Sequence, residues 1–198
     1  AKKPEQQATT QQETTTFNIG FQKYGILPIV KTKGELEKRL AAQGIKVKWI
    51  EFPAGPQLLE GLNVGSVVFG EAGEAPPIFA QAANPNLIYV ANQPPAPTAE
   101  ALIVQKDSPI QSIQDLKGKR IALNKGSNVH YLLLKLLEAH NLKLSDIQPV
   151  YLPPSDARAA FEKGVVDAWV IWDPFLAADE NQIQARVIAN GENLVNNH

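Results

Sequence analysis

The sequence predicts an α/β protein in which short strands alternate with helices. From Phe17 onward, apolar segments of strand length alternate with segments of helical periodicity, and residues 166–171 form a mostly apolar segment that is typical of a buried strand. The helix expected at 129–140 carries leucines at 132, 133, 136 and 137 on one face. This alternation favours parallel sheets with helices packed on their faces.

Glycine and proline residues mark the ends of these elements. Gly44, Gly65 and Gly164 follow helical segments, the turn-rich stretch 93–97 separates two strands, and Ser112 is placed to cap a short helix. We therefore expect strands at 17–21, 46–52, 67–70, 87–92, 101–105, 120–123, 149–152, 166–171 and 186–189, and helices at 28–42, 56–63, 76–83, 129–140, 156–163 and after Pro174.

One order of elements occurs twice. Helix 57–63 leads through a glycine to a buried strand and a proline-containing loop, and helix 157–163 does the same. Two similar lobes that offer these loops to a shared cleft would produce this repeat, and 198 residues suffice for two small lobes. Chance is the alternative, because helix–glycine–strand units are common in α/β proteins.

Composition excludes several classes of function. The chain has 19 Lys and Arg against 20 Asp and Glu, so no basic surplus exists for phosphates and we expect no nucleic acid partner. The absence of cysteine excludes disulfides, thiolate catalysis and cysteine-ligated zinc. The three histidines share no metal-ligand spacing, and HExxH, GxSxG, Walker and GxGxxG motifs are missing. We expect no metal, no cofactor and no enzyme activity.

The first 16 residues are polar and rich in Gln and Thr, which predicts a disordered leader or tether, or a remnant of processing or cloning. The sequence contains no apolar run of the roughly 18–20 residues that a membrane span needs.

The strongest chemical signal is the stretch 125–130, between a strand and the long helix. Free N–H groups at a helix start form an uncharged cradle for an anion, and Ser127 and Asn128 add donors. His130 lies one residue further on, beyond Val129. A sulfonate suits such a cradle because it stays ionised and only accepts hydrogen bonds. The alternative is that Ser127 or Asn128 merely caps the helix.

A second helix start, at Gly73 and Glu74, can meet the ligand from the other lobe. Backbone N–H groups there are suitable donors, whereas the Glu74 carboxylate either favours the helix dipole, faces solvent or meets an amino group of the ligand. Gln22 follows the first strand, where loops of α/β sheets line ligand crevices.

Two indoles stand near the end of strand 166–171. Trp169 and Trp172 offer an apolar wall for a ligand tail, or one or both belong to the core. Asp173, before Pro174, is a candidate to position Trp172 or to contact the other lobe.

Several ordered segments resemble the aliphatic-sulfonate-binding proteins of ABC importers, relatives of the taurine-, nitrate- and thiamine-precursor-binding proteins. The matching segments are 52–57, 62–66, 75–83, 115–118, 125–127, 146–149, 156–161 and 167–174. The resemblance implies a type II periplasmic binding protein fold with two α/β lobes and a ligand cleft. It implies lobe one at 17–99, with 193–198 returning towards it, and lobe two at 100–192.

The resemblance also implies a function and partners. We expect an extracytoplasmic or periplasmic protein that captures a small organic anion, an alkanesulfonate, and delivers it to an ABC permease. Taurine, nitrate or a pyrimidine precursor are alternative ligands. A small α/β enzyme with His130 as its acid–base group and a sensor domain of the same fold are alternatives of other classes.

This sequence departs from the family at Val68, Ala72 and in length. Family members commonly carry aspartate and a hydroxyl residue at the first two positions, and they continue for roughly another hundred residues. If the chain ends at His198, the C-terminal part of lobe one is missing and an exposed sheet edge invites self-association.

Overall fold

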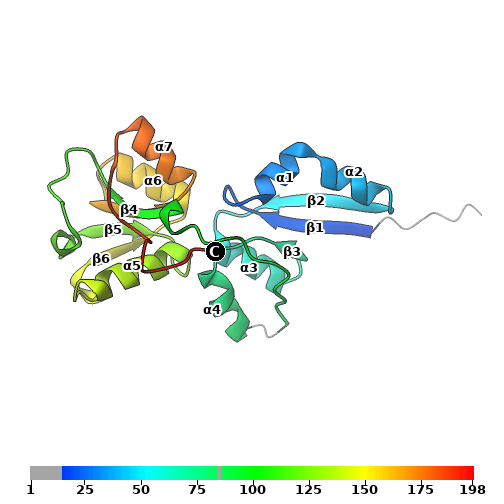
Figure 1. Cartoon of the computed structure of the whole chain (residues 1–198), viewed down its shortest axis with the longest axis horizontal. Coiled ribbons are helices and arrows are strands. Elements are labelled where there is room, and N and C mark those ends of the chain that lie inside the picture. Colours follow the sequence, from blue (N-terminus) through cyan, green and yellow to red (C-terminus); the bar gives the residue numbers. More distant parts are fainter. Residues whose placement is uncertain (1–14, 84–85) are drawn as a thin grey trace, which may run out of the picture.

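The computed structural model describes residues 15–83 and 86–198, which form two bodies, each built on its own sheet (Figure 1). The first body has a three-stranded sheet in the order β2-β1-β3, with every pair parallel. Its elements are β1 (Thr15–Phe21), α1 (Leu27–Lys33), α2 (Glu35–Ala41), β2 (Ile45–Glu51), α3 (Gly55–Asn63), β3 (Phe69–Gly70) and α4 (Ala75–Ala83).

Strand alternation decides which face of the first sheet meets which helices. Ile19 and Phe21, two residues apart on β1, pack with Leu27 of α1 and with Trp49 of β2. Gly20 faces the opposite side, where the absence of a side chain lets Leu58 of α3 approach closely. Helices therefore cover both faces of this sheet.

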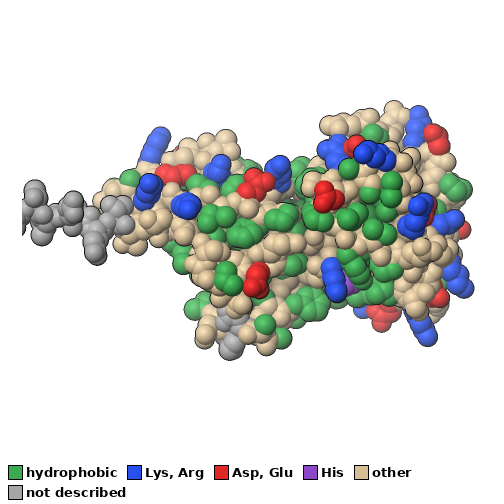
Figure 2. All heavy atoms as spheres, turned by 180° about the vertical axis from the view of Figure 1, so that it is seen from behind, with side chains coloured by type: hydrophobic (Ala, Val, Ile, Leu, Met, Phe, Trp, Pro, Cys, Tyr) green, Lys and Arg blue, Asp and Glu red, His purple; other side chains and the backbone are tan. Residues whose placement is uncertain are grey.

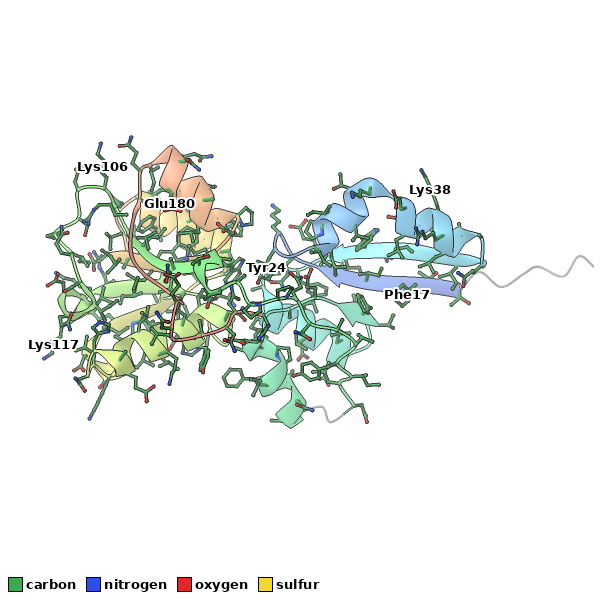
Figure 3. All side chains as sticks on the ribbon, viewed as in Figure 1. Phe17, Tyr24, Lys38, Lys106, Lys117 and Glu180 are labelled. Atoms are coloured by element: carbon green, nitrogen blue, oxygen red, sulfur yellow. The ribbon has the colours of Figure 1, made fainter. Side chains whose placement is uncertain are left out.

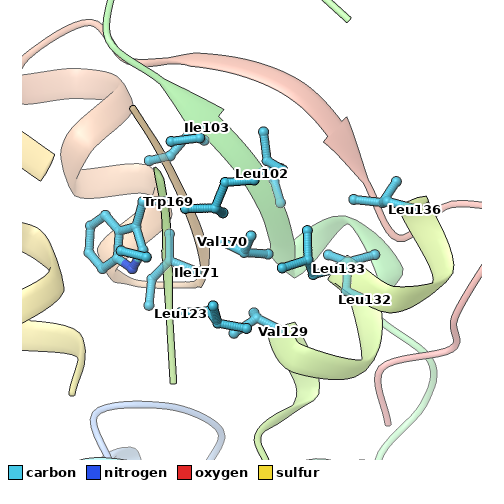
Figure 4. Packing of buried hydrophobic residues seen from close by; sticks show 14 of the residues in the cluster. Leu102, Ile103, Leu123, Val129, Leu132, Leu133, Leu136, Trp169, Val170 and Ile171 are labelled. Carbon is cyan, nitrogen blue, oxygen red and sulfur yellow. The ribbon is translucent and has the colours of Figure 1, made fainter. Parts of the chain in front are cut away.

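The second body has a five-stranded sheet in the order β6-β5-β7-β4-β8. Its elements are η1 (Pro97–Ala99), β4 (Glu100–Val104), η2 (Ile113–Leu116), β5 (Arg120–Leu123), α5 (Asn128–Ala139), η3 (Leu144–Asp146), β6 (Gln148–Tyr151), α6 (Pro154–Glu162), β7 (Ala168–Trp172), α7 (Phe175–Gln182) and β8 (Arg186–Asn190). The apolar face of α5 packs on β4 and β7, with Leu133 beside Val170 (Figure 4).

The alternating pattern correctly predicted the α/β class, but four details differ. Strand β4 runs antiparallel to both of its neighbours rather than parallel. The single helix expected at 28–42 is broken by Gly34, which adopts φ 64° and ends α1. The strand expected at 87–92 is irregular backbone, with Ile88 80% exposed and no described strand paired with it. Thr15 and Thr16, assigned to the leader, belong to β1; residues 1–14 lie outside the described residues.

Two chain segments lie side by side where the bodies meet. The Ala96 N–H donates to the carbonyl oxygens of Asn196 and Asn197, at 3.0 and 3.1 Å, and the Gly191 N–H donates to the Pro97 carbonyl. Figure 1 shows the last residues of the chain running into this junction. The loops after β1, β3 and β5 open towards the same region, so the junction is where a ligand can touch both bodies.

Candidate functional site

The helix starts expected to face each other are in contact. A side chain at Gly73 would overlap the carboxamide of Asn128, so this glycine is what lets the two loops approach. Gly73 precedes α4 in the first body, and Asn128 is the first residue of α5 in the second. Of the residues singled out in the sequence, these two meet directly across the junction.

Gln22 is held at the same junction by the β3–α4 loop. Its side chain is 5% exposed, and its Nε2 donates to the Glu71 carbonyl oxygen at 2.9 Å. The Glu71 carboxylate accepts from the N–H groups of Ile26 and Leu27 at the start of α1, at 3.0 and 3.1 Å. These bonds tie the β1 and β3 loops together and hold Gln22 against the loop that leads to Gly73.

Ser127 and His130 hold the α5 loop rather than point their polar groups outward. The Ser127 hydroxyl donates to the Asn124 carbonyl at 2.6 Å, and the Gly126 N–H donates to His130 Nδ1 at 3.0 Å. The Ser127 N–H donates to the Asn124 carbonyl and the His130 N–H to the Ser127 carbonyl, which leaves the N–H groups of Asn128 and Val129 at the start of α5. The donors that remain for an anion at this helix start are the N–H groups of Asn128 and Val129 and the Asn128 side chain, while Ser127 and His130 hold the loop.

The His130 contact predicts a pH dependence of stability. Burial first, and then the charge of Lys125, lower the pKa of His130 below its ordinary value of about 6.5. The unfolded chain therefore binds this proton more readily than the folded protein does. The contribution of His130 to the free energy of unfolding is fully present above roughly pH 6.5, and it is lost as the pH falls through the lowered pKa. Replacement His130→Gln keeps an acceptor for Gly126 without titrating. Between roughly pH 7 and pH 5, the unfolding temperature of this variant should fall less than that of the wild type. Equal decreases would show that His130 does not cause the pH dependence.

Asn197 connects both bodies, and no signal in the sequence pointed to it. It is 1% exposed, and its Oδ1 accepts from Asn128 Nδ2 at 2.7 Å and from the Tyr24 hydroxyl at 3.4 Å. Its Nδ2 donates to the Ala96 carbonyl at 2.8 Å, and its backbone N–H donates to Glu74 Oε1 at 3.1 Å. Asn197 thus occupies the point at which donors from both bodies converge; Figure 3 shows Tyr24 at this junction.

Carboxylates dominate the electrostatics of the junction. Glu100, the first residue of β4, is 1% exposed, and burial together with the charge of Glu74 raises its pKa to about 8. Burial, followed by the charges of Glu100, Glu71 and Glu74, raises the pKa of Tyr24 to about 12. At neutral pH the Glu100 carboxyl is therefore mostly protonated, and the Tyr24 hydroxyl keeps its hydrogen.

The expected aromatic wall lies inside the second body. Trp169 is 1% exposed and packs against Phe161 and Phe175, with ring centroids 5.9 and 6.3 Å away. Trp172 is 6% exposed and belongs to the same core. Asp173 accepts from the Ala177 N–H at 3.1 Å, which caps α7. Trp169 is therefore a core residue and Asp173 caps a helix, whereas Trp172 is buried as the cross-strand partner of Glu100.

An apolar groove that the sequence did not reveal runs between α3 and α4. It has a volume of about 240 Å³, and its walls include Pro56, Leu59, Pro76 and Phe79. Gly126 of the α5 loop also lines it, so the groove adjoins the anion cradle. Figure 2 shows hydrophobic side chains gathered over the middle of one face of the molecule.

A profile of the family described as NMT1/THI5 like matches residues 40–195. The chain belongs to this family. An Escherichia coli K12 protein named for aliphatic sulfonate binding is 51% identical over 179 residues, which are 90% of this chain and 56% of that protein. The taurine-binding periplasmic protein of the same organism is 30% identical over 75% of this chain and 45% of its own length.

A solved structure agrees with the family assignment. The alkanesulfonate-binding protein SsuA of Xanthomonas axonopodis pv. citri, bound to MOPS, superposes with a TM-score of 0.86 at 50% identity, over 91% of this chain and 62% of that one. The fold is thus that of the periplasmic binding proteins, as the sequence predicted. This chain spans between 45% and 62% of the length of these relatives. No helix within residues 15–83 and 86–198 is long and apolar enough to cross a membrane.

Proposed function

We propose that this chain provides the binding cleft of an extracytoplasmic solute-binding protein that captures an alkanesulfonate and delivers it to an ABC permease. The observation that carries the proposal is the contact between Gly73 and Asn128, which brings helix starts from two bodies to one place. The name of the aliphatic sulfonate-binding relative supports the ligand class, and the name of the taurine-binding periplasmic protein supports the location.

The head group would be held by uncharged donors. The N–H groups of Asn128 and Val129, with the positive end of the helix dipole, favour an oxyanion at this position. Asn128 Nδ2 and the Tyr24 hydroxyl now donate to the Asn197 oxygen. A sulfonate oxygen accepts the same hydrogens when it replaces that oxygen. Gln22 has a second amide hydrogen available in addition to the one bonded to Glu71.

Binding would couple to the relative position of the bodies. The donors come from loops of both bodies, so a ligand that satisfies them together stabilises the closed arrangement more than an open one. The permease would recognise that closed shape. The apolar groove beside Gly126 provides a surface for the carbon chain of the ligand, in place of the indoles expected from the sequence.

Calorimetry tests the proposal directly. We expect butanesulfonate to bind with a dissociation constant of about 1 μM or tighter, which corresponds to roughly −8 kcal/mol. The measurement needs a phosphate or imidazole buffer, because many common buffers are themselves sulfonates. Replacement Asn128→Asp puts a negative charge against the head group and should weaken binding at least ~10-fold. The exposed Asn181→Asp on α7 is the matched control.

The outcomes separate the competing functions. Absence of heat with ethanesulfonate, butanesulfonate and taurine would refute the proposal, whereas binding of nitrate or a pyrimidine precursor alone would replace its ligand. The enzyme hypothesis needs His130 as a free acid–base group, but its Nδ1 is engaged by the Gly126 N–H. Unchanged ligand after long incubation with the protein is the result we expect.

A further inference from the structure

The Asn197 side chain occupies the place at which donors from the two bodies converge. Its Oδ1 accepts from Asn128 Nδ2, at 2.7 Å, and from the Tyr24 hydroxyl, at 3.4 Å. Asn128 begins α5 in the second body, whereas Tyr24 lies in the loop after β1 in the first. One oxygen atom thus receives hydrogens from both bodies, which is the role that the proposed function gives to an oxygen of the ligand.

The other polar groups of Asn197 fasten this side chain in place. Its Nδ2 donates to the Ala96 carbonyl at 2.8 Å, and its backbone N–H donates to Glu74 Oε1 at 3.1 Å. The Ala96 N–H in turn donates to the Asn197 carbonyl oxygen at 3.1 Å. Asn197 is enclosed, at 1% exposure, so a ligand cannot reach the donors of Asn128 and Tyr24 while the carboxamide stays between them.

The backbone of Asn197 has a conformation that needs support. Its φ of 53° lies in the left-handed region, which residues other than glycine rarely adopt and asparagine tolerates better than most. The hydrogen bonds to Ala96 and Glu74 compensate for this conformation. Tertiary contacts therefore place the side chain, and a ligand that takes over the donors of Asn128 and Tyr24 removes part of what holds it.

We propose that the Asn197 carboxamide is an internal competitor of the ligand, which occupies the head-group position in the unliganded protein, links the two bodies there and leaves when a sulfonate binds. The inference rests on the proposed function, because it takes the Asn128 and Tyr24 donors to belong to the ligand site. The hydrogen bonds of the carboxamide then stabilise only the unliganded protein, so they lower the apparent affinity for the ligand.

Removing the carboxamide should strengthen ligand binding rather than weaken it. Asn197→Gly deletes the competing oxygen, adopts a positive φ freely and keeps the backbone N–H that donates to Glu74. Calorimetry with butanesulfonate, in a buffer without sulfonate, should give at least ~5-fold tighter binding than in the wild type. The matched control is Asn193→Gly, the same change at an exposed residue with φ 63°, which should stay within ~2-fold of the wild type.

The outcomes separate this inference from the proposed function. Equal or weaker butanesulfonate binding by Asn197→Gly would overturn the internal competitor and leave the proposed function standing, as would an equal gain in Asn193→Gly. Absence of binding by the wild type and by both variants would overturn the proposed function itself.

Hydrogen exchange on the wild type tests displacement without any substitution. The enclosed Nδ2 hydrogens of Asn197, whose NMR signals are assigned by their absence from Asn197→Gly, should exchange slowly with solvent in the unliganded protein. Saturating butanesulfonate should accelerate this exchange at least ~10-fold, because the side chain leaves the junction. Unchanged or slower exchange would show that Asn197 stays in the bound site and would overturn the inference.

Small-angle scattering tests the link between the bodies. Unliganded Asn197→Gly should have a larger maximum dimension than the unliganded wild type, because the bonds from the carboxamide to Asn128, Tyr24 and Ala96 are lost. Butanesulfonate should bring the two proteins to the same dimension. Equal dimensions without ligand would contradict the linking role of Asn197.

Discussion

Replacing Gly73 by valine should weaken butanesulfonate binding by ~100-fold or more. A Cβ at this position already overlaps the Asn128 carboxamide, and the two further methyl groups of valine leave the loops no way to meet. The bodies would then be held apart, and the first-turn N–H groups of α5 would lose the opposite side of the ligand. Calorimetry measures the affinity, and small-angle scattering with and without ligand measures closure.

A second pair of variants separates steric overlap at Gly73 from a general loss of folding. Gly73→Ala adds only one methyl group against a short side chain, so its loss of affinity should be smaller than that of valine. Combining Gly73→Ala with Asn128→Gly makes room for the methyl group, and the double variant should close on ligand more completely than Gly73→Ala alone. Wild-type affinity in Gly73→Val would show that the two loops do not need to touch.

The importance of Gly73 and Asn128 was predictable because both lie at helix starts after strands. Local sequence reports such positions well, because a glycine or a short polar residue directly before a helical pattern is typical of a helix start with free N–H groups. Asn197 was missed for the opposite reason. The partners of its Oδ1 are 69 and 173 residues away along the chain, and an asparagine that follows Asn196 near the end of the chain carries no local pattern.

The indoles show where periodicity fails. The sequence allowed two interpretations of Trp169 and Trp172, an apolar wall for the ligand tail or a place in the core. In the structure α5, α6 and α7 contact β7, and every residue of the strand is buried. Which face of a strand remains uncovered depends on helices far away in sequence, so a buried central strand and a cleft wall look alike in sequence.

The sequence pattern predicted the fold class better than it predicted which strands pair and in which direction. Alternating elements gave the α/β class, but β4 runs antiparallel to both of its neighbours, β7 and β8. The segment 87–92 has β-forming residues, yet no strand of the described chain pairs with it. Strand formation needs a partner as well as propensity, and propensity is all that a single segment reveals.

Stability of the second body depends on one buried carboxylate. Asp179 of α7 is 0% exposed, and burial raises its pKa while Arg158 of α6 lowers it. Arg158 Nε lies 3.0 Å from Asp179 Oδ1 and 2.7 Å from Glu162 Oε1, and its Nη2 donates to Gln182 at 2.6 Å. One guanidinium group therefore joins α6 to α7 and compensates an enclosed charge.

Replacing Arg158 by leucine should lower the free energy of unfolding by about 3–5 kcal/mol, because it leaves Asp179 buried without its counter-charge. For a chain of this size, the unfolding temperature should fall by roughly 6–20 °C. The double variant Arg158→Leu with Asp179→Leu should recover much of the loss, and Arg39→Leu on the exposed surface of α2 should have little effect.

The pH dependence identifies the unpaired charge as the cause. In Arg158→Leu the pKa of the Asp179 carboxyl rises further, so protonation of this group relieves the cost. The difference in free energy of unfolding between the variant and the wild type should therefore narrow as the pH falls towards roughly 4. A gap that stays constant with pH would mean that the loss comes from packing of the arginine stem instead of from the unpaired charge.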